Sequence, residues 1–298
     1  MPSNEQRRQA AKRKLERQLA NRAARTKRRR TITIISSVLA VVIVVGGVYL
    51  LVTMGHSNST ASAASPSSTT SAAPTTTSNP GVPTTGPCKY TTTPGTPAPA
   101  GKTVGVPADP NPTPKTGTVS ITLHTNFGDI PLTLDRAAAP CTVQSFLHLA
   151  SGKFYDNTNC HRETAYPTLK VLQCGDPTGQ GTGGPGYTIP DEKPTNLKAG
   201  PTDPSSGTAS SIYPRGVIAM ANTGQPNTGG SQFFLIYADS QLPPDYAVFG
   251  ATSGAGLTTL DKIAANGITP GTDPSTGQSS TQDGKPKQTV TIQQAQVS

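Results

Sequence analysis

Apolar and polar residues alternate in two neighbouring stretches of the chain. The first covers residues 119–123 and the second residues 130–134, and a turn at 126–129 separates them. A period of two is expected of strands with one buried face. The pattern therefore predicts a β-hairpin at the start of a folded domain.

The period becomes helical in two short segments. Apolar residues recur every three or four positions over 140–150, and Gly152 stands where a C-cap glycine is expected. A second helix is predicted over 257–266, with Gly267 after it. Further short apolar runs predict strands at 169–172, 216–220, 232–237, 246–249 and 289–297. Many short strands with two isolated helices are typical of a mainly β fold, a closed antiparallel barrel with capped ends.

An uncharged apolar stretch at 32–54 precedes the domain. It is long enough to cross a bilayer, which needs roughly 20 apolar residues. Because Arg28, Arg29 and Arg30 lie on its N-terminal side, that side should be cytoplasmic. We predict a single-pass cell-membrane protein with a cytoplasmic tail at 1–31 and an extracytoplasmic C-terminal part. A cleaved signal peptide is the alternative, although its apolar region is usually only about 7 to 15 residues.

Positive charge is concentrated at the N-terminus. The formal net charge is +9, and the first 30 residues contain 12 Lys or Arg but only Glu5 and Glu16. The basic balance therefore describes the tail and not the domain. Clustered basic residues can bind nucleic acid, but we favour the alternative that they orient the anchor and are attracted to anionic lipid. We expect a membrane partner and no nucleic acid.

Residues 55–117 are nearly all Ser, Thr, Ala, Pro and Gly, so they cannot offset the entropy of ordering by burying apolar surface. They predict a disordered linker, or stalk, ahead of a domain at 118–298. Cys88 is the exception, because a cysteine there suggests that the distal stalk is tied to the domain.

Four cysteines follow the apolar stretch, namely Cys88, Cys141, Cys160 and Cys174. An even number in an extracytoplasmic region predicts one or two disulfides, and three full pairings remain open. A zinc site is the alternative, but no two cysteines have the short spacing of metal knuckles. No metal is expected.

Candidate chemistry lies in two segments, 160–176 and 220–234. Together they contain an arginine, two glutamines, an asparagine and an aromatic residue, without an adjacent nucleophile or carboxylate pair. Such a set suits chemistry in which an amide is turned and not cut. The stretch 179–184 matches G-x-G-x-x-G, but no helical pattern follows, so no nucleotide cofactor is expected.

A set of residues in 118–298 matches a known family pattern, in order and with sensible gaps. The set comprises 125–128, Ala139, Pro140, Thr142, Val143, Phe146, 154–156, His161, Arg162, Gln173, 175–179, Gly186, Tyr187, Asp191, Glu192, Arg215, Gly216, 220–222, Gly224, 226–228, 230–234 and 248–250. With these residues the chain resembles the cyclophilin-type peptidyl-prolyl cis-trans isomerases. The resemblance implies an eight-stranded closed barrel capped by two helices and, with the anchor, a membrane-anchored bacterial, actinobacterial-like member.

The chemistry of these residues suits rotation about an Xaa-Pro bond, whose barrier is about 18 to 20 kcal/mol. A guanidinium near the prolyl nitrogen stabilises the twisted amide more than the planar one. The expected catalytic residues are Arg162, Gln173, Asn222 and Phe234. The expected substrate-binding residues are Leu169, Val171, Ala221, Thr223, Gln232, Leu242 and Tyr246. His161 should face the opposite way from Arg162 and be structural.

The chain also departs from the family pattern. Extra residues after Arg162 place Leu169 or Lys170 where the family has a pocket phenylalanine, and Gln241 lies where many members have a tryptophan that helps to bind cyclosporin. Tyr246 replaces a common histidine, and Thr223 a small alanine. We expect isomerase activity to be retained in spite of these departures, and cyclosporin binding to be weak.

Three classes of function remain open. The first is a monomeric isomerase that acts on proline-containing peptides and unfolded exported proteins without a cofactor. The second is a low-turnover binding module or chaperone on the same barrel, and the third is a structural spacer. Retention of Arg162, Gln173 and Phe234 favours the first.

Overall fold

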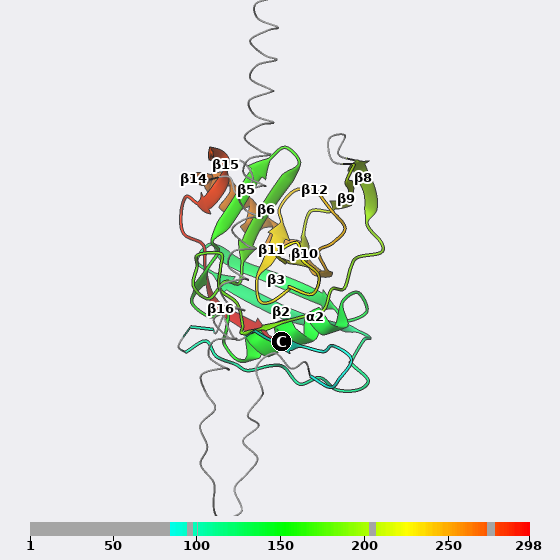
Figure 1. Ribbon diagram of the computed structural model, residues 1–298. Coiled ribbons are helices and arrows are strands. Elements are labelled where there is room, and N and C mark those ends of the chain that lie inside the picture. Colours follow the sequence, from blue (N-terminus) through cyan, green and yellow to red (C-terminus); the bar gives the residue numbers. More distant parts are fainter. Residues whose placement is uncertain (1–83, 94–97, 100, 203–206, 273–277) are drawn as a thin grey trace, which may run out of the picture. The chain divides into compact units, whose positions relative to one another are not determined.

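The structure, a computed structural model, describes residues 84–93, 98–99, 101–202, 207–272 and 278–298 (Figure 1). The predicted tail, the apolar stretch and most of the predicted linker lie outside these residues. Within the described ranges, no helix has the length and apolarity needed to span a bilayer. The fold described below is that of one compact unit, Thr75–Ser298, here called the second unit because Met1–Pro74 precedes it.

The second unit is mainly β, and its described residues include two helices, as predicted. The helices are α2 (Pro140–Ser151) and α3 (Ala255–Asn266). The strands are β1 (Thr91–Thr92), β2 (Thr118–Thr125), β3 (Gly128–Asp135), β4 (Thr158–Asn159), β5 (Arg162–Tyr166), β6 (Leu169–Cys174), β7 (Tyr187–Thr188), β8 (Lys198–Thr202), β9 (Ala209–Tyr213), β10 (Val217–Met220), β11 (Phe233–Ile236), β12 (Ser240–Leu242), β13 (Val248–Thr252), β14 (Ile268–Thr272), β15 (Ser279–Pro286) and β16 (Thr291–Val297).

The predicted hairpin is formed by β2 and β3, which pair antiparallel from Thr118 opposite Asp135 to Thr125 opposite Gly128. Every second residue of β3 is buried, as the alternation predicts. Gly128 closes the turn at a φ of +123°, a conformation that side chains disfavour.

Eleven strands form one antiparallel sheet in the order β14-β15-β5-β6-β11-β10-β13-β3-β2-β16-β4. This order has two ends, so the ladders of the described residues do not show the predicted closure of eight strands into a barrel. Two smaller sheets, β1-β7 and β12-β9-β8, accompany it. Figure 1 shows α2 against the end of the unit that contains β2 and β3.

The central strands are buried on both faces, and each face belongs to a different cluster. Along β11, Phe233 and Leu235 join the main core, whereas Phe234 and Ile236 join a second, smaller cluster. Successive side chains of a strand point to opposite faces. The second cluster includes Val171 of β6, and it forms the base of the candidate site described below.

Helix α2 begins at Pro140, a residue favoured in the first turn because the missing N–H would have no partner there. Its N-cap residue, Ala139, supplies no side-chain hydrogen bond. Instead, the Glu192 carboxylate accepts hydrogen bonds from the backbone N–H groups of Cys141 (2.9 Å) and Thr142 (2.8 Å). A negative charge at this end is also favourable to the helix dipole.

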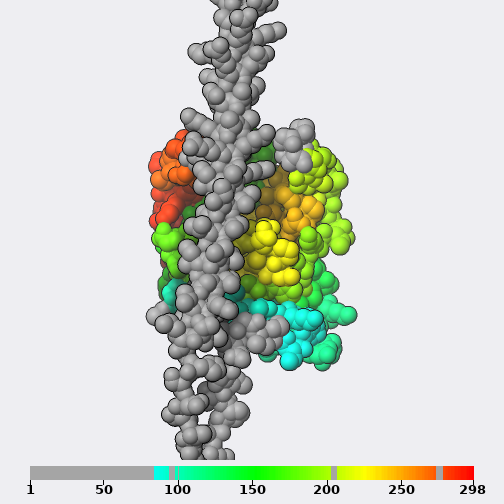
Figure 2. All heavy atoms as spheres, in the orientation of Figure 1, coloured from blue at the N-terminus to red at the C-terminus, as the bar shows by residue number. Residues whose placement is uncertain are grey.

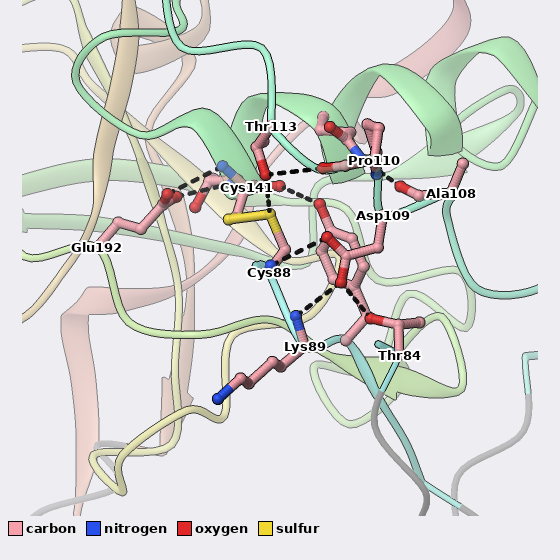
Figure 3. The surroundings of a disulfide bond; sticks show 12 residues. Thr84, Cys88, Lys89, Ala108, Asp109, Pro110, Thr113, Cys141 and Glu192 are labelled. Atoms are coloured by element: carbon pink, nitrogen blue, oxygen red, sulfur yellow. Dashed lines mark hydrogen bonds between the residues drawn. A yellow bond between two sulfur atoms is a disulfide. The ribbon is translucent and has the colours of Figure 1, made fainter. Parts of the chain in front are cut away.

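The described residues of 84–117 (84–93, 98–99 and 101–117), here called the strap, pack against the rest of this unit. Cys88 and Tyr90 are completely buried, and Cys88 forms a disulfide with Cys141 of α2. The Asp109 carboxylate accepts hydrogen bonds from the N–H groups of Cys88 (3.0 Å) and Lys89 (2.9 Å), which fixes the turn beside the disulfide (Figure 3). Cys88 and Tyr90 of the strap therefore belong to the main core.

Two segments rich in Pro, Gly, Ser and Thr, 193–211 and 269–287, contribute residues to paired strands. Strands β8 and β9 pair antiparallel at the first segment, and β14 and β15 pair antiparallel at the second. The pairing satisfies the backbone of these strands, whatever the polarity of their side chains. In the space-filling view, β14–β15 (orange to red) and β8–β9 (yellow-green) lie at opposite sides of one face (Figure 2).

Candidate active site

The candidate site is centred on two adjacent strands, where Arg162 of β5 pairs directly with Gln173 of β6. The Cys160–Cys174 disulfide links the chain immediately beside this pair, and the His161 N–H donates to the Gln173 carbonyl oxygen at 3.1 Å. The positions of Arg162 and Gln173 are thus fixed by the β5–β6 pairing and by the neighbouring disulfide. Of the three possible cysteine pairings, the structure has Cys88–Cys141 and Cys160–Cys174.

A cavity of about 160 Å³ lies beside Arg162. Its size suits a single side chain and not a drug-sized ligand, for which about 300 Å³ or more is usual. All four predicted catalytic residues line it, together with five of the seven predicted substrate-binding residues. These are Arg162, Gln173, Asn222 and Phe234, with Leu169, Val171, Ala221, Leu242 and Tyr246.

The base of the cavity is apolar. Phe234 is almost fully buried, and the Tyr246 ring meets it edge-on, with centroids 5.4 Å apart and planes at 80°. Tyr246 also contacts Tyr213 in an edge arrangement, which holds it in place. Of the two residues Leu169 and Lys170, only Leu169 lines the cavity, and its side chain is aliphatic.

Arg162 is fixed by an acidic residue that sequence reasoning missed. Its Nε donates to Asp283 Oδ1 at 2.8 Å, and its Nη2 donates to Asp283 Oδ2 at 2.6 Å. Its Nη1 reaches Gln173 Oε1 at 3.3 Å. The hydrogen bonds with Asp283 raise the pKa of Arg162, so the guanidinium is charged at any physiological pH.

A chain of amide side chains leads away from Arg162. Gln173 Nε2 donates to Gln232 Oε1 at 3.1 Å, and Gln232 Nε2 donates to the carbonyl oxygens of Gly181 and Gly183, both at 3.0 Å. The Asp176 carboxylate holds the same glycine loop from within, because it accepts the backbone N–H of Gly181. The two glutamines are therefore oriented by partners on both sides.

A second groove, of about 600 Å³, adjoins the cavity and shares Gln173, Ala221 and Asn222 with it. The remaining two predicted binding residues, Thr223 and Gln232, line this groove and not the cavity. The glycine stretch that matches the nucleotide fingerprint forms part of its wall. A peptide whose proline filled the cavity could place its neighbouring residues along this groove.

Asn222 uses its side chain within the protein. Its Nδ2 donates to the Asp245 carbonyl oxygen at 3.0 Å, and its Oδ1 accepts the Gly224 N–H at 2.9 Å. The side chain therefore shapes the loop after β10. The backbone of Asn222 remains available for a substrate contact at the cavity that this residue lines.

A family model described as "Cyclophilin type peptidyl-prolyl cis-trans isomerase/CLD" matches residues 120–297. The chain belongs to this family. A Mycobacterium leprae protein named "Probable peptidyl-prolyl cis-trans isomerase B" is 51% identical over 188 residues, which is 63% of this chain and 58% of that protein. A Mycobacterium tuberculosis protein of the same name is 49% identical over 191 residues, 64% of this chain and 56% of that protein.

A Streptomyces anulatus protein, "Peptidyl-prolyl cis-trans isomerase B", is 39% identical over 169 residues, which cover 51% of this cyclophilin and 87% of that protein. The matched region spans less than two thirds of either mycobacterial relative.

The residue before Arg162 is turned away from the cavity of this cyclophilin. His161 is buried, and a Cβ on Gly181 would lie 3.2 Å from its Cδ2. Burial lowers the pKa of His161, so the imidazole is neutral near pH 7. It does not line the cavity, in agreement with a structural role.

Asp283 escaped sequence reasoning because it lies in a polar segment, 121 residues after its partner. One local signal was present. The dipeptide Asp283–Gly284 is common in turns, but in this cyclophilin it belongs to β15, where a Cβ on Gly284 would collide with the Thr269 carbonyl oxygen of β14.

Proposed function

We propose that this cyclophilin accelerates the cis–trans isomerisation of Xaa-Pro bonds in extracytoplasmic proteins, by non-covalent stabilisation of the twisted amide. The observation that carries the proposal is the position of Arg162. Its guanidinium stands at the edge of a cavity of side-chain size whose base is Phe234. A proline ring in the cavity would bring its amide nitrogen beside Arg162, the one cationic side chain among the described residues that line the cavity.

The physical step is the loss of amide resonance. At the twisted geometry the nitrogen lone pair is no longer delocalised into the carbonyl, and the nitrogen becomes a hydrogen-bond acceptor. An N–H of Arg162 can then donate to it, which it cannot do to the planar amide. An interaction made only in the transition state lowers the barrier and is not lost to ground-state binding.

The remaining residues have binding roles in this proposal. Phe234, Val171 and Leu242 would receive the ring, while Gln173 and the backbone of Asn222 would hold the carbonyl and the flanking peptide. No bond is formed or broken with the enzyme, so the step needs neither a nucleophile nor a cofactor.

An extracytoplasmic substrate is proposed from two features. Residues 32–54 are uncharged, and they follow a basic tail. In addition, the described unit contains two disulfides, which persist in oxidising compartments. We infer that the protein is a monomer held by one N-terminal helix, that it acts on unfolded exported chains outside the cytoplasm, and that nucleic acid is not a partner.

Isomerisation of short Xaa-Pro peptides by the full chain in detergent tests the activity. We expect Arg162→Ala to lower kcat/KM by about 10²- to 10³-fold, the usual cost of losing one transition-state donor. Peptide affinity should change far less. The matched control is Arg215→Ala, because Arg215 forms a similar ion pair with Asp261 but does not line the cavity.

The second candidate is a low-turnover binding module, which is favoured by the aliphatic Leu169 at the cavity wall. Its signature is distinct. The wild type would bind the peptides, and wild type and Arg162→Ala would be equally slow.

A further inference from the structure

Among the described residues, the Arg162 guanidinium forms an ion pair with Asp283, and this pair is more enclosed than the other ion pairs of that part of the chain. The Asp283 side chain is 6% exposed and the Arg162 side chain 32% exposed. The two bonds, at 2.8 Å and 2.6 Å, form the parallel fork in which both carboxylate oxygens meet two N–H groups. This geometry fixes the plane of the guanidinium as well as its position.

We propose that Asp283 is a positioning residue for isomerisation, and that the β14–β15 hairpin serves to bring it to Arg162. The inference rests on the proposed function. Asp283 does not line the cavity, so it acts through the arginine and not on the substrate.

The register explains how the contact arises. Asp283 of β15 pairs with Thr164 of β5, two residues beyond Arg162. Side chains two apart on a strand share a face, so Arg162 and Asp283 are diagonal neighbours, within reach of a long side chain. Gly284, the next residue, allows β14 to approach closely, because any Cβ there would collide with the Thr269 carbonyl oxygen.

The bonds to Asp283 determine which N–H groups face a substrate. Asp283 takes one N–H from Nε and one from Nη2, and Gln173 takes one from Nη1. The second N–H groups of Nη1 and Nη2 are left for the cavity. Without the carboxylate, the weaker bond to Gln173 would remain, and the guanidinium could rotate away from the prolyl nitrogen.

The carboxylate also has a cost, since it offsets part of the arginine charge. Orientation should outweigh this cost, because a misplacement of about 1 Å in a reacting group can cost about 100-fold in rate. A nearly buried carboxylate is itself expensive unless it is paired. The buried position of Asp283 is therefore favourable only while both of its charge-assisted hydrogen bonds to Arg162 are made.

The test is steady-state isomerisation by the full chain carrying Asp283→Asn, which retains the size of the side chain but only one acceptor. We expect kcat to fall about tenfold with little change in KM, since the lost bond acts through a transition-state donor. In an Arg162→Lys background, Asp283→Asn should add little further loss. The matched control is Asp261→Asn, which weakens the surface ion pair between Asp261 and Arg215 Nη2 and should leave kcat unchanged.

A second measurement does not depend on turnover. The Arg162 Nε–H signal in ¹⁵N spectra should exchange slowly with water in the wild type and rapidly in Asp283→Asn. The Arg215 Nε–H, which donates to the Tyr237 carbonyl oxygen, should behave the same in both proteins.

Two results would overturn the inference. One is an Asp283→Asn variant with wild-type kcat, whatever its melting temperature. The other is an equal loss of kcat with and without Arg162, which would mean a general structural effect. If the wild type did not isomerise peptides but kept its protected Nε–H, the proposed function would fall while the positioning of Arg162 stood.

Discussion

Arg162 and Glu163 are adjacent on β5, yet they meet opposite surroundings. Arg162 faces the cavity and Asp283, whereas Glu163 is 1% exposed, and its Oε2 has no hydrogen-bond partner among the described residues. Burial raises the pKa of Glu163 to about 7. One strand therefore presents a fixed cation on one face and a carboxyl that is easily neutralised on the other.

Glu163 makes a pH dependence of stability testable. Its ordinary pKa is 4.5, so the folded state binds the proton more tightly than the unfolded chain. Protonated Glu163 therefore contributes to the free energy of unfolding, by at most about 3 kcal/mol. This contribution is fully present below about pH 4.5 and is lost as the pH rises through about 7. Urea unfolding at pH 5 and pH 8 should show a larger loss for the wild type than for Glu163→Gln.

The difference between the pH dependences of the two unfolding free energies reports on Glu163 alone, because His161 and the other titrating groups are present in both the wild type and Glu163→Gln. Parallel pH profiles for wild type and variant would rule out a raised pKa at this position.

At the scale of elements, the strap and the β14–β15 hairpin complete a fold that the periodic segments leave unfinished. The strap adds Cys88 and Tyr90 to the core, and the Tyr90 hydroxyl donates to the Cys141 carbonyl oxygen at 2.9 Å. Gly152 after α2 illustrates the same dependence. Its position as the C-cap was predicted, but its φ is −79°, and a Cβ there would collide with Val104 of the strap.

Removing the Cys88–Cys141 disulfide by a double serine substitution should destabilise the protein by about 2 to 4 kcal/mol. Loop closure makes this disulfide worth more than Cys160–Cys174, because 53 residues separate the first pair and 14 the second. Denaturant titration of both double variants gives the comparison. Limited trypsin digestion should also cut the strap at Lys89 and Lys102 only in the first variant.

The opposite order of stability would contradict a loop-closure origin. Unchanged trypsin resistance would show that burial of Tyr90 holds the strap without the disulfide.

At the scale of the whole molecule, the proposed membrane topology places the catalytic unit outside the cytoplasm. A reporter that is active only after export, fused after Ser298, should be active, because the basic residues before 32–54 retain the N-terminal side in the cytoplasm. Replacing Arg28, Arg29 and Arg30 with glutamate should reduce that activity. A fusion that worked only with a cytoplasmic reporter would contradict the topology and, with it, the exported substrates.

Local pattern predicted much of the fold and most of the cavity. A hydrophobic period of two or of a helix predicts the β2–β3 hairpin and both helices, and short apolar runs predict the central strands. Such patterns are readable because they depend on neighbours within a few residues. The residues lining the cavity were identified by their resemblance to a family. The eight-stranded closure was expected on the same ground, but the ladders do not show it.

By itself, the sequence determined the β2–β3 hairpin, both helices and most of the central strands, the family, and the gathering of Arg162, Gln173 and Phe234 around one cavity. Only the tertiary structure decided the disulfide pairing, the docking of the strap and the fork between Arg162 and Asp283. These contacts join residues as many as 121 positions apart. Such contacts depend on how the strands meet in space and leave no period along the chain, so local physics cannot reveal them.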